Sequence, residues 1–295
     1  MALNLGGTYT ALVTPFTPDG GLDLEALAKL CEWQIASGVD GLVPCGSTGE
    51  AATLSHEEHV RVVRHVVEVA AGRVPVIAGA GSNSTREAIE LTQAARSAGA
   101  DAALLISPYY NKPTQEGIFQ HYRAVAQETR LPILVYNIPG RTASRIEPET
   151  SARLSRVPGV IGLKECGADL IATSETIAQS APTFAVLSGD DALTLPMLAI
   201  GARGAISTVS NVLPAATAEL TRAHAAGNAA RARALHYELL PVTQSLFIES
   251  NPIPVKTALA ILGRIPSAAL RLPLTEISKA NRERLEAVLA ELPRA

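Results

Sequence analysis

The chain has 295 residues, of which 47% are hydrophobic and 18% charged, and its formal net charge at pH 7 is -3. This balance supports a sizeable buried core, argues against disorder, and gives no basic surface for nucleic acid. Residues 1–7 show no secretory signal, and no apolar run approaches the roughly 20 residues of a membrane span. The three cysteines have no metal-ligand spacing. We therefore expect a reduced cytoplasmic protein without a bound metal.

Eight short apolar runs rich in β-branched residues punctuate the first two thirds of the chain. Each run is too short for a helix, and most are followed by Gly, Pro or Ser/Thr, which is typical of strands that end in turns. The runs start roughly 20 to 35 residues apart, the length of one strand plus one helix. They are residues 9–13, 41–44, 76–80, 102–106, 132–136, 160–163, 185–187 and 205–209.

The segments between the runs have helical periodicity, as in residues 24–31, 56–67 and 88–95. Alternating strands and helices favour right-handed crossovers and a parallel sheet. Eight repeats favour closure into a barrel, and no Gly-x-Gly-x-x-Gly opens a helix to suggest a dinucleotide-binding fold. We therefore predict the α/β class, with a (β/α)8 TIM barrel at residues 1–226.

From Val212 onward the strand pattern stops. We predict a helix at residues 214–226 that closes the eighth unit, and a C-terminal helical appendage at residues 227–295, with Thr275 as the N-cap of its last helix. The helices expected in the appendage are residues 229–249, 255–262 and 275–292.

Chemically versatile residues follow several of the predicted strands, at the end of a parallel barrel where catalytic groups lie. The turn at residues 46–50, Gly-Ser-Thr-Gly-Glu, could direct its amides at an anion or could be an ordinary turn. Tyr136 ends the fifth strand, and Arg141 in the next loop suits a carboxylate substrate, although a surface Arg that caps a helix is the more common case. Tyr109 and Tyr110 stand together in a Pro-bounded loop, where packing and chemistry are equally plausible.

Lys164 gives the sharpest signal, because it ends the apolar run at residues 160–163 and would point into the barrel mouth. Burial disfavours a charged amine and lowers its pKa from the ordinary value of about 10.4. A neutral amine in a pocket is what imine formation with a carbonyl needs. The alternative is a structural ion pair of Lys164 with Glu165 or another carboxylate.

Asp190 and Asp191 after the seventh strand are sufficiently explained as helix caps.

Taken together, these stretches resemble the dihydrodipicolinate synthases, within the pyruvate-dependent class I aldolase family that includes N-acetylneuraminate lyase. The resemblance runs from Thr14-Pro15 to the motif at residues 251–256, Asn-Pro-Ile-Pro-Val-Lys. It implies a lyase that condenses pyruvate with L-aspartate 4-semialdehyde in the diaminopimelate route to lysine. It also implies a homotetramer that needs neither a metal nor an organic cofactor.

Site residues follow from the resemblance position by position. Lys164 is similar to the Schiff-base lysine and Tyr136 to the proton-transferring tyrosine of the family. Ser47 and Tyr110 fall where the family has a hydroxyl relay, whose tyrosine comes from a neighbouring subunit. The substrate-binding positions are Thr48 with the Ser47 amide for the pyruvate carboxylate, Arg141 for the carboxylate of the aldehyde substrate, and Gly189 and Ile206 as pocket lining.

Two positions depart from the family pattern. Many members carry Thr at the position of Ser47, and a serine loses the methyl group that fixes the rotamer. Cys166-Gly167-Ala168 stands where small residues with a hydroxyl, or Ala, are more familiar, and the sequence suggests no function for Cys166.

The resemblance further implies an allosteric site for lysine, the end product of the pathway. His56, His59, Asn83, Glu87 and Tyr109 occupy the matching positions. Glu87 could pair with the α-amino group of lysine and Asn83 could bind its carboxylate. The alternative for His56 and His59 is a solvated pair on the helix after the second strand.

Two rival functions remain open at this point. The same lysine and tyrosine could serve an aldolase or dehydratase that acts on a 2-keto-3-deoxy sugar acid, although Arg141 suits a short charged aldehyde better than a polyol. A barrel that only binds a keto acid as a sensor or scaffold is the second rival, and the full set of acid–base groups argues against it.

Overall fold

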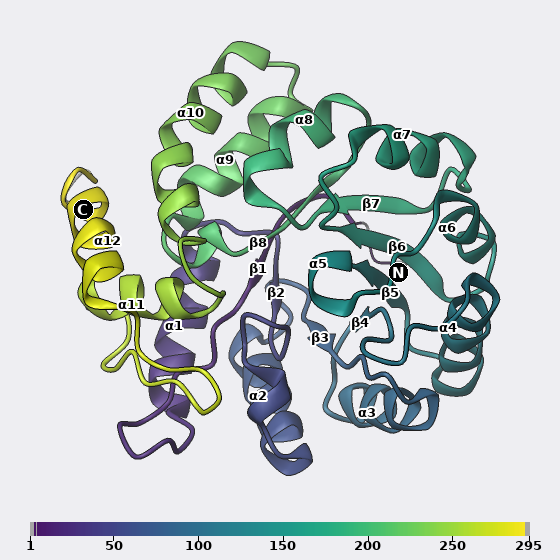
Figure 1. The fold of residues 1–295 in the computed structure, drawn as a ribbon, viewed down its shortest axis with the longest axis horizontal. Helices are drawn as coiled ribbons and strands as arrows, with labels where there is room; N and C mark the ends of the chain where they lie inside the picture. The colour runs from purple at the N-terminus through teal and green to yellow at the C-terminus, as the bar shows by residue number, and fades with distance from the viewer. Residues whose placement is uncertain (1–2, 4, 293–295) are drawn as a thin grey trace.

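The computed structural model describes residue 3 and residues 5–292. Its eight parallel strands form one sheet in the order β2-β1-β8-β7-β6-β5-β4-β3. The two outer strands are joined by a parallel bridge between Leu42 and Val76, and the Leu42 amide donates to the Pro75 carbonyl at 3.0 Å. The sheet therefore closes into the predicted barrel, with a ring of helices around it (Figure 1).

The strands agree with the predicted runs to within a few residues. They are β1 Gly7–Ala11, β2 Gly41–Val43, β3 Ile77–Gly79, β4 Ala102–Ile106, β5 Ile133–Asn137, β6 Val160–Glu165, β7 Ala185–Ser188 and β8 Gly204–Ser207. Two of the ends that differ from the prediction involve site residues. Strand β6 continues through Lys164, and β8 stops at Ser207, because the Asp191 carboxylate accepts the amides of Thr208 and Val209 and turns the chain.

Helices follow the strands as predicted. Those of the barrel are α1 Leu24–Ala36, α2 His56–Ala70, α3 Thr85–Ser97, α4 Gln115–Thr129, α5 Pro139–Thr142, α6 Pro148–Leu154, α7 Leu170–Gln179, α8 Thr194–Ala199 and α9 Pro214–Ala225. In the described part of the chain, three 3-10 turns lie in the loops, at Ala51–Thr53, Asp191–Leu193 and Val209–Asn211. The C-terminal helices are α10 Ala229–Ser245, α11 Ile253–Ile261 and α12 Lys279–Ala290.

The predicted start of the last helix at Thr275 is wrong, because Ser278 is the N-cap of α12. The amide and hydroxyl of Ser278 both donate to Glu249 Oε1, at 3.0 and 2.7 Å. Glu249 itself was expected inside the preceding helix, but α10 ends at Ser245. The carboxylate of Glu249 thus ties the loop after α10 to the start of α12.

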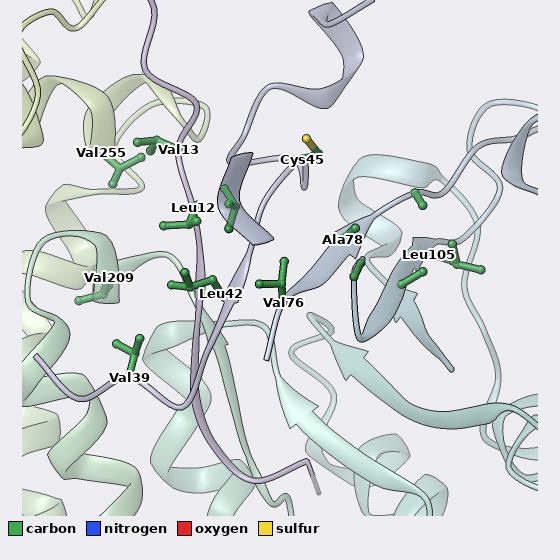
Figure 2. Packing of buried hydrophobic residues seen from close by; sticks show 14 of the residues in the cluster. Leu12, Val13, Val39, Leu42, Cys45, Val76, Ala78, Leu105, Val209 and Val255 are labelled. Atoms are coloured by element: carbon green, nitrogen blue, oxygen red, sulfur yellow. The ribbon is translucent and has the colours of Figure 1, made fainter. Parts of the chain in front are cut away.

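The buried core has two layers. The inner layer fills the barrel and includes Tyr9, Leu134, Tyr136, Leu187 and Ile206. The outer layer packs between strands and helices, and Figure 2 shows part of it around β2 and β3. Side chains of α11 belong to this outer layer, so the C-terminal helices share the core of the barrel.

The C-terminal helices lie on one side of the barrel, where α10 packs along α9 and α12 contacts both α10 and α11 (Figure 1). The division at residue 226 stays a prediction, and α9 ends at Ala225. Among the described residues, no helix is both long and apolar enough to cross a membrane.

Candidate active site

Lys164 and Tyr136 lie side by side at the carboxyl end of the barrel. They are register partners on β6 and β5, and the alternation along a strand turns both side chains inward. Lys164 is only 6% exposed, and its Nζ atom lies 4.3 Å from the centroid of the Tyr136 ring. No ion pair involves Lys164 within the described part of the chain.

The alternative of a Lys164–Glu165 ion pair is wrong. Glu165 points to the other face of β6, as the next residue of a strand must. Its carboxylate accepts hydrogen bonds from Asn137 Nδ2 at 2.9 Å and from the Gly167 amide at 2.5 Å. The amine of Lys164 is left without a structural carboxylate partner.

Burial sets the protonation of this pair. Desolvation lowers the pKa of Lys164, and the positive charge of Arg141 adds to this, whereas Cys166 and Asp191 act in the opposite direction. Desolvation also raises the pKa of Tyr136 well above its ordinary value, although Arg141 and a hydrogen bond from Ser47 oppose the rise. The arrangement therefore favours a neutral amine beside a protonated phenol, the pair that imine chemistry requires.

Cys166 is the neighbour that the sequence left without a function. Its thiol donates a hydrogen bond to the Tyr136 hydroxyl at a sulfur–oxygen distance of 3.9 Å. Burial raises the pKa of this thiol to about 11, so it is protonated at neutral pH and is a poor nucleophile. It thus acts as a weak donor to Tyr136.

The turn at residues 46–50 offers an anion site beside these groups. The Gly49 and Glu50 amides close the turn onto the carbonyls of Gly46 and Ser47, at 3.0 and 3.2 Å. The amides of Ser47 and Thr48 have no acceptor within the described residues. Two adjacent free N–H groups in a turn can bind a carboxylate.

Asn251 is a residue of this site whose role the sequence did not reveal. Its Nδ2 atom donates to Thr48 Oγ1 at 2.9 Å, and its carbonyl oxygen accepts a hydrogen bond from Arg141 Nη2 at 2.8 Å. It thereby links the two residues that were expected to hold substrate carboxylates. The 251–256 motif had pointed to the family, but no local pattern indicates that its first residue reaches a turn 203 positions earlier.

Asp191 is a second residue whose role at this site the sequence did not reveal. The sequence suggests a helix cap, but the carboxylate is buried and accepts hydrogen bonds from the Ser207 hydroxyl and from the amides of Thr208 and Val209, the latter two at 3.0 and 3.2 Å. Desolvation raises its pKa. Asp191 thus fixes the end of β8, and its charge acts on Lys164.

Gly189 and Ile206 lie against these groups, and their role as pocket lining stays a prediction. A Cβ atom at Gly189 would lie 2.6 Å from Lys164 Cε and 2.2 Å from Cys166 Sγ, so only glycine fits there. Ile206 is fully buried in the inner layer of the core with Tyr136.

Tyr110 differs from the other predicted catalytic residues in its exposure to solvent. Its side chain is 88% exposed, and its hydroxyl has no hydrogen-bond partner in the described part of the same chain. The φ angle of +71° belongs to the left-handed region, and the Tyr110 amide donates to the Thr142 carbonyl at 3.3 Å. No hydrogen bond joins Tyr110 to Tyr136 within the described part of the chain.

The residues of the expected lysine site gather between the starts of α2 and α3. His56 Nε2 lies 3.1 Å from Glu87 Oε1, the Ser82 hydroxyl donates to Oε2 of the same carboxylate, and Asn83 Nδ2 donates to the Tyr109 carbonyl at 3.2 Å. His59 differs from the expected solvated pair. It is buried, its Nε2 lies 2.7 Å from the Gly79 carbonyl, and desolvation lowers its pKa.

Comparison with known proteins extends over nearly the whole chain. The family model described as the dihydrodipicolinate synthetase family matches residues 4–292. A curated relative from Nitratidesulfovibrio vulgaris (strain DP4), named 4-hydroxy-tetrahydrodipicolinate synthase, is 54% identical over 285 residues, which cover 96% of this chain and 97% of the relative.

Two solved structures were determined with informative ligands. The chloride-inhibited dihydrodipicolinate synthase from Acinetobacter baumannii, complexed with pyruvate, is 44% identical with a TM-score of 0.95, over 97% of this chain and 98% of that one. The enzyme from Cyanidioschyzon merolae, with lysine bound, is 39% identical with a TM-score of 0.94, over 97% of both chains.

Proposed function

Since the chain belongs to the dihydrodipicolinate synthetase family, we propose that its barrel mouth condenses pyruvate with L-aspartate 4-semialdehyde, the reaction of a 4-hydroxy-tetrahydrodipicolinate synthase. The chain is an enzyme of the lyase class, and its reaction belongs to the diaminopimelate route to lysine. The single observation that carries the assignment of the site is the buried amine of Lys164, which has no ion pair in the described part of the chain and lies 4.3 Å from the Tyr136 ring centroid.

In the first half of the reaction, neutral Lys164 attacks the ketone carbon of pyruvate. Tyr136 delivers a proton to the departing hydroxyl, so water leaves and a protonated imine forms. The free amides of Ser47 and Thr48 bind the pyruvate carboxylate meanwhile. The lysine supplies the electron sink, and the chemistry therefore requires neither a metal nor an organic cofactor.

In the second half, the imine loses a methyl proton and becomes an enamine. Its carbon adds to the aldehyde of L-aspartate 4-semialdehyde, whose carboxylate Arg141 binds. The amino group of the bound substrate then attacks the imine carbon and displaces Lys164, which closes the ring of the product and regenerates the free amine. Tyr136 shuttles the protons, and Ser47 and Tyr110 connect it to solvent.

We propose that Tyr110 completes this relay from a neighbouring copy of the chain, and its exposure in the isolated chain supports this. We therefore propose a homo-oligomer, a homotetramer by resemblance, in the cytoplasm. The barrel at residues 1–226 would hold the chemistry, and residues 227–295 would support it.

The cluster of His56, Asn83, Glu87 and Tyr109 is proposed as a feedback site for lysine, with His59 packed behind it. The lysine bound in the related structure from Cyanidioschyzon merolae supports this assignment. Titration of lysine tests it, because activity that is unchanged at millimolar lysine contradicts a feedback site.

A 2-keto-3-deoxy sugar acid is the alternative substrate for the same Lys164 and Tyr136. Arg141 and the names of curated relatives above 50% identity favour the short aldehyde. A coupled assay with both substrate types separates the two functions.

Borohydride reduction tests the proposed chemistry directly. The protein is incubated with pyruvate, reduced, digested and mapped by mass spectrometry. We expect a single pyruvate-derived adduct on the peptide that contains Lys164. Absence of an adduct, or an adduct on another lysine, contradicts the proposal.

A further inference from the structure

Glu50 closes the turn that carries Ser47 and Thr48, in an unusual environment. Its backbone is left-handed, with φ at +54°, a conformation that a non-glycine residue adopts only at a cost. Its carboxylate is buried and is held by two groups from the far end of the chain. Lys256 Nζ donates to Oε1 at 2.7 Å, and the Arg271 amide donates to Oε2 at 3.1 Å.

The ion pair between Glu50 and Lys256 is completely enclosed. The two side chains are 1% and 0% exposed, and the ammonium group lies 4.0 Å from the centroid of the Phe16 ring. Burial lowers the pKa of Lys256, and Glu50 opposes that change. A buried pair of this kind adds little stability over an apolar pair, because both ions lose their water, but it fixes the relative placement of the segments that carry them.

The same helix start also holds the turn at a second point. Asn251 lies two residues before α11, and its Nδ2 atom donates to Thr48 Oγ1 at 2.9 Å. Lys256 lies in the first turn of α11, where its amide donates to the Pro252 carbonyl at 3.0 Å. The C-terminal region therefore holds the turn at both Thr48 and Glu50, on either side of Gly49.

We propose that Glu50 and Lys256 are positioning residues, through which the C-terminal helices hold the Ser47 and Thr48 amides in the geometry that binds the pyruvate carboxylate. The inference rests on the proposed function, because it assigns that turn to pyruvate. Neither residue touches the substrate, and both act through the turn.

The pair is tested by Glu50→Gln, Lys256→Met and the double variant. Each single variant leaves one buried charge without its partner, so we expect a lower Tm and a higher KM for pyruvate. The double variant buries no charge, so its Tm returns toward that of the wild type. Its KM for pyruvate is expected to stay about 10- to 100-fold raised, the effect of a displaced binding group, while kcat and the KM for the aldehyde stay near wild-type values.

Glu50→Asp provides a test that keeps both charges. The shorter carboxylate pulls the turn toward Lys256, so a smaller rise in the pyruvate KM is expected. The matched control is Glu219→Gln with Arg231→Met, which removes an exposed, bidentate ion pair between α9 and α10 and leaves all kinetic constants unchanged.

A double variant that folds and has a wild-type KM for pyruvate overturns the proposal, as does an unchanged KM in Glu50→Asp. Borohydride trapping separates this failure from that of the proposed function. A wild-type protein that forms no adduct with pyruvate contradicts the function itself. A wild type and a double variant that are trapped with the same pyruvate dependence contradict only the positioning role.

Discussion

Tyr136 and Lys164 are paired residues on neighbouring barrel strands, and the Lys164 amine lies 4.3 Å from the centroid of the Tyr136 ring. The ring lies on one side of the amine, and Gly189 leaves room for the lysine stem. A ring face attracts a cation, but desolvation is the larger effect and lowers the pKa of Lys164. The contact between these two residues thus places a buried amine beside a phenol, a group that can donate a proton.

Lys164→Met should abolish activity without loss of stability. Removal of the nucleophile is expected to lower turnover by at least about 10³-fold and to abolish borohydride trapping. Because the buried amine has no ion pair in the described part of the chain, a methionine of similar shape should keep or raise Tm. Lys279→Met, an exposed lysine at the start of α12, is the control for both measurements.

Wild type and Lys164→Met should also differ in how their stability depends on pH. Since the folded-state pKa of Lys164 lies below its ordinary value of 10.5, the unfolded chain binds more protons between these two values. The free energy of unfolding of the wild type should therefore rise relative to that of Lys164→Met as pH rises through this window. Below the window, the wild type should show the full destabilisation that comes from burying a charged lysine. Denaturant titrations of both proteins across alkaline pH measure the difference, and parallel curves would contradict the lowered pKa.

Tyr136→Phe should separate proton transfer from packing. The variant keeps the ring against Lys164 but loses the hydroxyl, so we expect kcat to fall by about 10²- to 10⁴-fold, as on loss of a general acid–base group. Tm should change little, because the hydroxyl's bond to Cys166 is a weak one of 3.9 Å. Steady-state kinetics measure the loss, with the exposed Tyr237→Phe as the control. Near-normal turnover would assign the proton transfers to another group.

Asp191→Asn should shift the pH profile of imine formation. The Asp191 charge favours the protonated form of Lys164, so its removal lowers the lysine pKa further and moves the acid limb of the trapping rate to lower pH. Asparagine can keep the bonds at the end of β8, since its oxygen can accept from the Thr208 and Val209 amides and its NH₂ group can donate to the Ser207 hydroxyl. Asp190→Asn is the control. If the acid limb of the trapping rate stays at the wild-type pH in Asp191→Asn, the prediction is wrong.

The barrel could be predicted from the sequence because each of its strands and helices is indicated by a local pattern. Each strand is an apolar run bounded by turn residues, and apolar residues recur every three to four positions along each helix. Lys164 stood out for the same reason, as a cation at the end of an apolar run. Alternation along β6 then places Lys164 inside and Glu165 outside, a result that the predicted strand end at Leu163 could not give.

The residues that were missed depend on contacts between distant segments. Asn251 meets Thr48 across 203 positions, and Lys256 meets Glu50 across 206. Asp191 looked like a helix cap because its partners at the end of β8 follow 16 to 18 residues later. The start of α12 was misplaced in the same way, since Glu249 rather than a local pattern fixes Ser278.

Arg141→Ala should raise the KM for the aldehyde substrate and leave pyruvate binding unchanged. Loss of charged hydrogen bonds to a carboxylate corresponds to a rise of about 10- to 100-fold. Pyruvate trapping at Lys164 should keep its concentration dependence, since the Ser47 and Thr48 amides hold that carboxylate. Arg145→Ala is the matched control in the same loop, where the arginine pairs with Asp169 at 3.0 Å. An equal rise in both KM values would show that Arg141 only supports the pocket through Asn251.

Complementation between two impaired chains should show whether Tyr110 acts across a subunit boundary. Tyr110→Phe alone is expected to lower kcat by about 10- to 100-fold through loss of the relay. A mixed pair contains one Tyr110→Phe chain and one Lys164→Met chain. The Tyr110→Phe chain keeps its Lys164 and receives an intact Tyr110 from the Lys164→Met partner, so one of the two active sites has both residues. Equal, statistical mixing should then restore about one quarter of wild-type activity. If Tyr110 serves its own chain, no mixed pair contains a complete site, and activity stays at the average of the two parents. The 88% exposure of Tyr110 favours recovery.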